Sequence, residues 1–265
     1  MTGGSKVVKI TARTALKGNM LKAIIASGVF LFCYFIANYS AGIFSYTGIN
    51  TVSYIILILM ILFLLAPLLL GFVRFIWRML FSADDSPVSV FYYLSEKNLY
   101  IKSVKFTFNL ILKAIPVGIL LFLPVILLWV FTQGAFYDLF GIPMPLWTAN
   151  LNTVIRILIV FAIVSLSFYM VRYYLAPVLF VADENMDINE TFYMSNIIAR
   201  KSSLDFIYLF SSFLGWILLS LLVIPLIFTL PYMATAYAVH SRFAIAEYNK
   251  HISFSANEGV MYGVQ

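Results

Sequence analysis

The chain has 265 residues and a formal net charge of +6 at pH 7; 63% of its residues are hydrophobic and 11% are charged. A soluble domain has about half of its residues apolar and about a quarter charged, so this composition excludes an ordinary soluble protein. Residues 55–70 form an unbroken apolar run, which excludes the alternating strands of an outer-membrane barrel. The sequence therefore predicts an all-α membrane protein.

Positive charge is segregated along the sequence. The Lys and Arg residues fall into four clusters, within residues 6–22, 74–113, 172–201 and 242–250, and Arg156 is the one exception. Short loops rich in Lys and Arg stay on the cytoplasmic side during membrane insertion. The pattern therefore predicts a membrane protein whose basic clusters and both termini are cytoplasmic.

The first two predicted spans cover residues 20–41 and 52–79, joined by a short uncharged connection and preceded by a basic interfacial helix. Pro67 lies inside the second span, where a proline usually produces a kink. Cys33 in the first span is expected to be a buried packing residue. Small residues such as Gly28 are expected to let neighbouring helices approach closely.

The second hairpin is predicted to begin at Ser86, an N-cap residue that is followed by Pro87 at the first helical position. This start predicts an interfacial helix over residues 88–100. The third and fourth spans are then predicted at residues 103–131 and 154–180. Two glycines and two prolines in the loop between these spans argue against a regular helix there.

The third hairpin is predicted to begin with an interfacial helix capped by Asp187. The apolar region that follows is interrupted early by Asp205 and is too long for one span of about twenty residues. We expect two spans instead, at residues 205–222 and 226–243, with a tight turn at Pro225.

The predicted domain organisation is one helical membrane domain over residues 1–250 and a flexible cytoplasmic tail over residues 251–265. A five-span alternative remains, in which the last apolar region is a single span and the tail lies outside. Arg242 and Lys250 argue against it, because they would then lie on the outer side.

One order of elements occurs three times: a basic interfacial helix, a span, a connection, and a second span that contains a proline. The residue pairs at these prolines are Ala66-Pro67, Ala176-Pro177 and Leu230-Pro231. The order predicts three helical hairpins and a threefold internal repeat, and such repeats can pack about an axis normal to the membrane. The alternative is coincidence, because basic inner segments and prolines are common in six-span proteins.

Residues 13–19, which end in Ala15-Leu16-Lys17-Gly18-Asn19, are similar to the opening of an uncharacterised bacterial integral-membrane family, called domain of unknown function nine-seven-five. Its closing pattern resembles two segments here, Ser212-Phe213-Leu214-Gly215-Trp216 and Leu230-Pro231-Tyr232. The chain departs from the family at residues 223–225, where a glycine is expected. The resemblance implies a bacterial plasma membrane, a multi-span helical fold and distant kinship with the membrane domain of some glycerophosphodiester phosphodiesterases. It implies no activity and no functional residues.

The sequence contains no motif for a familiar catalytic or metal site. It has no H-E-x-x-H, no G-x-S-x-G, and no glycine-rich phosphate loop that ends in Gly-Lys-Ser or Gly-Lys-Thr. We therefore predict that the protein is not an enzyme and has no catalytic residue, no bound metal and no cofactor.

Ionisable residues in or near the spans are better indicators of function, because burying charge in lipid is costly. Arg156 lies near the outer end of the fourth span, with Asp138 as a candidate partner. Arg172 and Asp205 lie near the inner interface and are expected to anchor the chain or to be paired. The candidate functional or structural residues are Pro67, Pro177, Pro231, Arg156, Asp138, Arg172 and Asp205.

The sequence favours a non-enzymatic membrane protein that acts through contacts with membrane lipids or with other membrane proteins. The alternative is a transporter or channel component for a lipid-like or weakly polar solute, which would need a cavity lined by the three prolines. An intramembrane enzyme that acts on lipids is third, and it would need carboxylates that converge on a histidine. Nucleic acid is not an expected partner, because the cations are spread over four membrane-flanking clusters.

Overall fold

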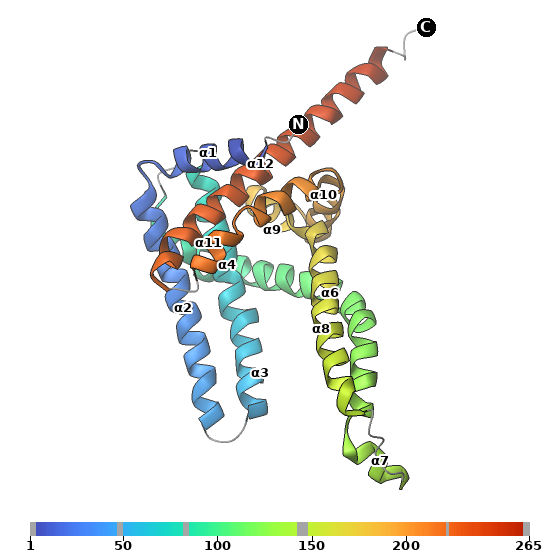
Figure 1. Ribbon diagram of the computed structural model, residues 1–265. Coiled ribbons are helices and arrows are strands. Elements are labelled where there is room, and N and C mark those ends of the chain that lie inside the picture. Colours follow the sequence, from blue (N-terminus) through green and yellow to red (C-terminus); the bar gives the residue numbers. More distant parts are fainter. Residues whose placement is uncertain (1–3, 47–49, 82–84, 142–147, 221–222, 262–265) are drawn as a thin grey trace. The chain divides into compact units, whose positions relative to one another are not determined.

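The computed structural model describes residues 4–46, 50–81, 85–141, 148–220 and 223–261, and the side chains within these ranges except at 44–46, 50, 134–136, 148–150, 223–224 and 251–261. The elements in these ranges are all helical, which confirms the predicted all-α class. The chain divides into two compact units (Figure 1), of which the first is Met1–Thr107 with Tyr173–Gln265 and the second is Phe108–Arg172.

The helices of the first unit are α1 (Ser5–Leu16), α2 (Met20–Tyr46), α3 (Asn50–Met60), α4 (Ala66–Met79), α5 (Tyr92–Ser95), α9 (Ala176–Ala182), α10 (Ile188–Ser211), α11 (Leu214–Leu219) and α12 (Val223–Met261). A π-helical turn, η1 (Ile61–Leu65), joins α3 to α4, and a 3-10 helix, η2 (Pro87–Phe91), precedes α5. The second unit holds most of α6 (Lys97–Phe131), with α7 (Gly134–Phe140) and α8 (Thr148–Met170), which η3 (Val171–Tyr173) follows.

Four helical stretches among the described residues are long and apolar enough to cross a membrane: Met20–Ile43, Thr51–Met79, Lys97–Phe131 and Leu151–Ala182. They correspond to the first four predicted spans, although the third begins at Lys97 instead of residue 103. These helices suggest a multi-pass membrane protein.

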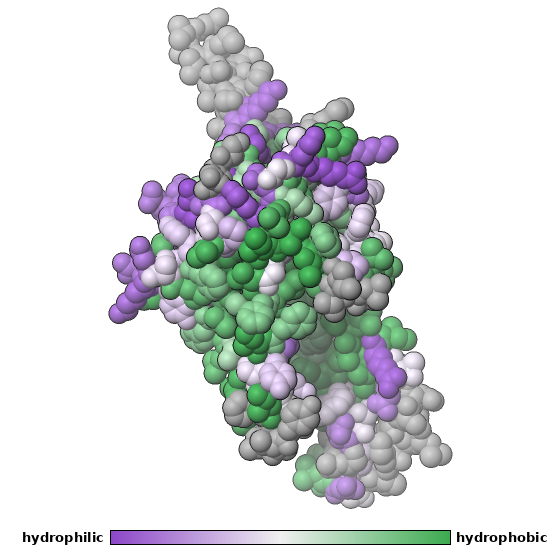
Figure 2. All heavy atoms as spheres, turned by 90° about the vertical axis from the view of Figure 1, so that its left-hand side faces the viewer, coloured by the Kyte–Doolittle hydropathy of each residue, from purple (hydrophilic) through white to green (hydrophobic). Residues whose placement is uncertain are grey.

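The surfaces of these helices fit a lipid environment. Large apolar side chains such as Tyr39, Leu120 and Phe161 are exposed on them. A continuous apolar surface of this kind is unfavourable in water and favourable against lipid tails. On the face of the first unit that Figure 2 shows, hydrophilic side chains gather at the end where α1 lies, and hydrophobic side chains cover the surface beyond it.

The two predicted helix starts are confirmed. The backbone N–H of Val88 donates to the Ser86 hydroxyl at 3.4 Å, and Pro87 opens η2. The backbone N–H of Asn189 donates to the Asp187 carboxylate at 3.0 Å at the start of α10. These caps satisfy backbone donors that the first turn of a helix leaves unpaired.

Two predictions about the second hairpin are wrong. The interfacial helix expected over residues 88–100 ends at Ser95, because Glu96 has extended backbone and α6 begins directly after it. The loop after the third span was expected to lack a regular helix, yet it contains α7. Its glycines lie at the ends of that helix: Gly134 begins it, and Gly141 ends it with a φ of +62°, a left-handed value that glycine adopts without strain.

The last apolar region differs from its predicted layout. Helix α10 continues to Ser211, and α11 follows after a break of two residues. Pro225 does not form the turn, because it lies in the first turn of α12, where its missing N–H disrupts no helical bond. Helix α12 runs through Pro231 and ends at Met261, well beyond the predicted end of the sixth span at residue 243. The flexibility of the tail stays a prediction.

Pro67 leaves a backbone carbonyl group without its helical hydrogen bond, and a tyrosine from another helix donates a hydrogen bond to it. A proline at position 67 has no N–H to donate to the carbonyl of Phe63, four residues earlier. The Tyr100 hydroxyl of α6 donates to that carbonyl at 3.1 Å. In a membrane helix such a substitute donor offsets the cost of the broken backbone bond.

A similar substitution occurs beside Pro177. Helix α9 begins at Ala176, and the N–H of Val178 donates to Leu175 instead of to Tyr174. The Tyr237 hydroxyl of α12 donates to the carbonyl of Tyr174. The prolines of the second and fourth spans therefore interrupt their helices at points where tyrosines from α6 and α12 bond to the free carbonyls.

Helix α4 lies at the centre of the first unit. Its residues Leu68, Phe72, Phe75 and Ile76 are buried against alanines of α2 and α12 and against Val90 of η2. Small side chains on the facing helices let the backbones approach closely, which is the usual way that membrane helices gain packing contacts. Cys33, predicted to be a packing residue, is half-buried against the same core.

The closest helix approach is at Gly71 of α4. A Cβ atom at this position would lie 1.9 Å from the carbonyl oxygen of Val90, so only glycine lets η2 lie against α4. Gly28 was expected to allow such a contact, but this prediction is wrong, because a Cβ atom there would meet nothing within 4 Å.

Replacing Gly71 with alanine should therefore destabilise the first unit by about 3 kcal/mol, because a rigid backbone carbonyl cannot move aside. Thermal unfolding of the purified protein in detergent measures this. Gly28→Ala is the matched control and should leave stability equal or raise it by up to about 1 kcal/mol, since alanine favours a helix. Equal effects of the two substitutions would contradict the close contact between α4 and η2.

Candidate functional site

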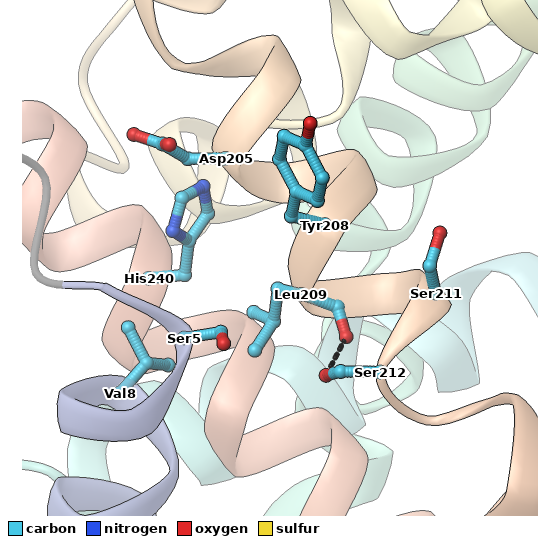
Figure 3. Close-up of a pocket in the computed structure, with 8 residues that line it drawn as sticks. All are labelled: Ser5, Val8, Asp205, Tyr208, Leu209, Ser211, Ser212 and His240. Carbon is cyan, nitrogen blue, oxygen red and sulfur yellow. Dashed lines mark hydrogen bonds between the residues drawn. The ribbon is translucent and has the colours of Figure 1, made fainter.

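Asp205 lies in a polar pocket together with His240 (Figure 3). Asp205 comes from α10 and His240 from α12, two helices that pack against each other. The pocket has a volume of about 550 Å³. Its lining residues, which we call the His240 pocket, are Ser5, Val8, Asp205, Tyr208, Leu209, Ser211, Ser212 and His240.

His240 is held rigidly. Its side chain is 1% exposed, and its Nε2 atom is hydrogen-bonded to the Tyr174 hydroxyl at 3.1 Å. That hydroxyl also shares a hydrogen bond of 2.8 Å with Ser202. The rings of Phe206 and Tyr174 stack with centroids 4.2 Å apart, and the ring of His240 stacks on Tyr174 at 5.8 Å. These contacts join α10 and α12 to the segment that precedes α9.

The His240 pocket can form hydrogen bonds with a polar group. Asp205 supplies an exposed carboxylate, and Ser5 and Ser211 supply hydroxyls. The hydroxyl of Ser212 already donates to the carbonyl of Leu209, as Figure 3 shows. The described residues include no group of three His, Cys, Asp or Glu side chains that could hold a metal ion.

A second cavity lies where α4, α9, α10 and α12 meet, and its volume is about 350 Å³. Its lining residues, which we call the central cavity, are Leu69, Phe72, Val73, Ile76, Pro177, Phe206, Phe210, Leu230, Met233, Ala234, Tyr237 and Ala238. Of the three prolines expected to line a cavity, Pro177 belongs to the lining of the central cavity. Pro67 and Pro231 lie near the lining residues Leu69 and Leu230 without belonging to the lining.

The remaining candidates lie in the second unit. Asp138 is exposed on α7 and Arg156 is exposed on α8, and among the described residues no ion pair joins them. Arg172 lies in η3, with its guanidinium carbon 5.5 Å from the ring centroid of Tyr169. A cation–π contact of this kind suits an interfacial anchor.

A cluster of ionised side chains surrounds Arg74, near the end of α4. The Arg74 side chain is only 11% exposed, and its Nε atom lies 3.2 Å from the Glu184 carboxylate. Its Nη1 atom lies 4.0 Å from Asp85, which Arg78 approaches to 3.2 Å. The Arg74 guanidinium also stacks 3.5 Å from the ring centroid of Tyr92. We call these five residues the Arg74 cluster.

Tyr92 completes this cluster. Its hydroxyl donates to the Glu184 carboxylate at 3.0 Å. Burial, assisted by this hydrogen bond, raises the pKa of Tyr92 above its ordinary value. Lys102 of α6 donates to the backbone carbonyl of Glu184. The Arg74 cluster and Lys102 therefore join α4, α5 and the start of α6 to the turn between α9 and α10.

Sequence analysis missed both Arg74 and His240 as site residues. Arg74 follows an apolar run, and this was a usable signal, because a cation beside such a run needs a partner. Its partner Glu184 is 110 residues away, so no local pattern could identify the pair. No local pattern marks His240 as a site residue either, because its contact with Tyr174 depends on the packing of distant helices.

Replacing Arg74 with methionine should lower the free energy of unfolding by about 3 kcal/mol, because it leaves two carboxylates near each other without a buried cation. Arg200→Met on the exposed side of α10 is the control and should change stability by less than about 0.5 kcal/mol. Denaturant or thermal unfolding in detergent compares the two. An Arg74 variant as stable as the control would refute the role of the Arg74 cluster.

Comparisons with known proteins add no relative of this chain. No family model matches it, no curated protein matches it, and no solved structure matches it. The resemblance to an uncharacterised bacterial family stays a prediction.

Proposed function

We propose that this chain is a non-enzymatic protein of the bacterial plasma membrane that acts by binding lipid within its helical bundle. The observation that carries the proposal is the central cavity. Eleven of its lining side chains are apolar, and the twelfth, Tyr237, already donates its hydroxyl to the carbonyl of Tyr174. A cavity without an available hydrogen-bond donor suits the acyl chain of a lipid.

An enzyme is the weaker interpretation. Asp205 and His240 share a pocket, which is the arrangement that a lipid-cleaving enzyme would need. However, His240 is almost fully buried, and its Nε2 atom is hydrogen-bonded to Tyr174. A histidine in these contacts supports the packing of α10 and α12, so we assign it a structural role.

Transport of a lipid-like or weakly polar solute is the second candidate. It is favoured by one observation, that Pro177 lines the central cavity beside the point where the fourth span is interrupted. An interrupted membrane helix can line a substrate path. Flux of a lipid-like solute into vesicles that contain the purified protein would favour this candidate over static binding.

For the topology we propose six helices in three hairpins, with both termini cytoplasmic. The Arg74 cluster supports this orientation, because it unites the end of the second span, the loop before the third, and the loop after the fourth. These segments must share one membrane face if the spans alternate in direction. The four basic clusters favour the cytoplasmic side for that face.

Packing in the first unit supports the threefold repeat. Helix α4 packs against η2, which follows it in the chain, and α9 packs against α10, which follows it in turn. Helix α12 packs against α1, the interfacial helix of the first hairpin. The second span of each hairpin therefore contacts the interfacial helix of the next hairpin. The contact of α12 with α1 joins the third hairpin back to the first, so the three contacts form a closed ring.

The third hairpin is proposed to lie less deeply in the membrane than the first two. Lys9 of α1 lies 4.7 Å from the ring centroid of Phe213, and Arg13 lies 5.7 Å from that of Tyr232. About ten residues, or about 15 Å of helix, separate Tyr232 from the connection between α11 and α12. This length is about half of the hydrocarbon thickness of a bilayer. Whether the third hairpin crosses the whole bilayer or enters only half of it, α12 returns to the cytoplasmic side.

Filling the central cavity tests the proposed function. Ala234→Phe adds a ring to the half-buried lining of this cavity and should lower the amount of lipid that co-purifies with the protein in mild detergent. Mass spectrometry of the purified protein measures the retained lipid.

Ala246→Phe is the matched control, because it makes the same change at an exposed position of the same helix. It should leave the retained lipid unchanged. If wild type retains no lipid, or if Ala234→Phe retains as much as wild type, lipid binding in the central cavity is wrong.

A further inference from the structure

A third cavity, which we call the α1 groove, lies between α1, the start of α2, α11 and α12. Its volume is about 430 Å³. Its lining residues are Arg13, Leu16, Lys17, Met20, Trp216, Phe228, Thr229 and Tyr232. This lining joins two cations to a mainly apolar surface, which distinguishes the groove from the central cavity and from the His240 pocket.

The cationic part of the groove is built by the turn between α1 and α2. Gly18 has a φ of +94°, a left-handed value that turns the chain sharply between Lys17 and Met20. Arg13 and Lys17 are both exposed, and among the described residues neither forms an ion pair. The N-terminus of α2 lies beside them and adds the positive end of a helix dipole. An anion is therefore favoured at this end of the groove.

The apolar part of the groove is formed by aromatic side chains. Trp216 is 44% exposed and Phe228 is 52% exposed, and the rings of Trp216 and Tyr232 lie edge to face with centroids 6.5 Å apart. The Tyr232 hydroxyl is buried and has no hydrogen-bond partner among the described residues. A buried hydroxyl without a partner is unfavourable, and a shift of the side chains that cover it would let an ester oxygen of a bound ligand accept a hydrogen bond from it.

The groove also lies beside the start of the first candidate span, where the proposed membrane location expects lipid headgroups. Met20, part of its lining, begins the first candidate span, so the cations beside it lie at the membrane boundary. A ligand with an anionic head and an apolar tail fits this groove. Its head would lie beside the cations at the membrane boundary, and its tail would lie along the aromatic side chains.

We propose that the α1 groove binds one anionic phospholipid, whose phosphate lies between Arg13 and Lys17 and whose acyl chain lies along Trp216 and Phe228. The proposal rests on the membrane location that the proposed function assumes, but it concerns a separate site. The cationic end of the α1 groove selects lipids with an anionic headgroup, whereas the central cavity selects only for an apolar acyl chain.

The test measures binding of phosphatidylglycerol and phosphatidylcholine to the purified protein by native mass spectrometry. Wild type should prefer phosphatidylglycerol, and Arg13→Gln or Lys17→Gln should each weaken its binding by about fivefold, or about twentyfold together. Lys6→Gln is the control, because it removes the same charge from an exposed position of α1 outside the groove. Soluble glycerol phosphate should not compete, since it lacks the tail.

A second measurement locates the tail. Phosphatidylglycerol with brominated acyl chains should quench tryptophan fluorescence, and Trp216→Phe should remove most of that quenching. Equal affinity for the two lipids, or an effect of Lys6→Gln as large as that of Arg13→Gln, would overturn the proposal, as would quenching unchanged by Trp216→Phe. Ala234→Phe should leave the lipid preference intact, so failure of the central cavity and failure of the α1 groove are distinguishable.

Discussion

The ion pair between Arg74 and Glu184 is the contact on which the rest of the first unit depends. A guanidinium at the end of an apolar helix is unfavourable unless carboxylates surround it, and Asp85 and Glu184 can reach it only if two connections fold onto the same end of α4. This requirement fixes η2 against α4, where Gly71 leaves room for the backbone of Val90. It also sets α9 and the start of α10 beside them, so the central cavity forms against this anchored helix.

The prolines show how a membrane bundle accommodates broken helices. Pro67 and Pro177 each interrupt a span, and the hydroxyls of Tyr100 and Tyr237 donate to carbonyls that the interruptions leave free. These side chains come from α6 and α12, so each interruption adds a contact between helices. The central cavity lies next to the second interruption, which links the proposed lipid site to the same backbone feature. The proposed lipid site therefore includes Pro177, a residue that the sequence singled out only as a proline within a span.

Local signals in the sequence predicted local structure well. The first four spans follow from long apolar runs, and Ser86 and Asp187 marked helix starts because capping depends on neighbouring residues. The Gly71 contact, the Arg74 cluster and the bond between His240 and Tyr174 could not be predicted, because each depends on which distant segments meet. Pro225 was misplaced for a related reason: a proline fits a turn and the first turn of a helix equally well. Of the candidate residues, Asp205 and Pro177 line cavities. Asp138 and Arg156 are exposed, and no ion pair joins them among the described residues.

Reporter fusions after Thr47, Gly141 and Gln265 test the central claim most directly, namely that all four basic clusters face the cytoplasm while three hairpins enter the membrane from that side. Alkaline phosphatase is active only outside the plasma membrane, and a fluorescent protein that folds only inside gives the complementary signal. The account predicts outside, outside and inside for the three positions. An external Gln265 or an internal Gly141 would contradict it, because the basic segments could then no longer share one face of the membrane.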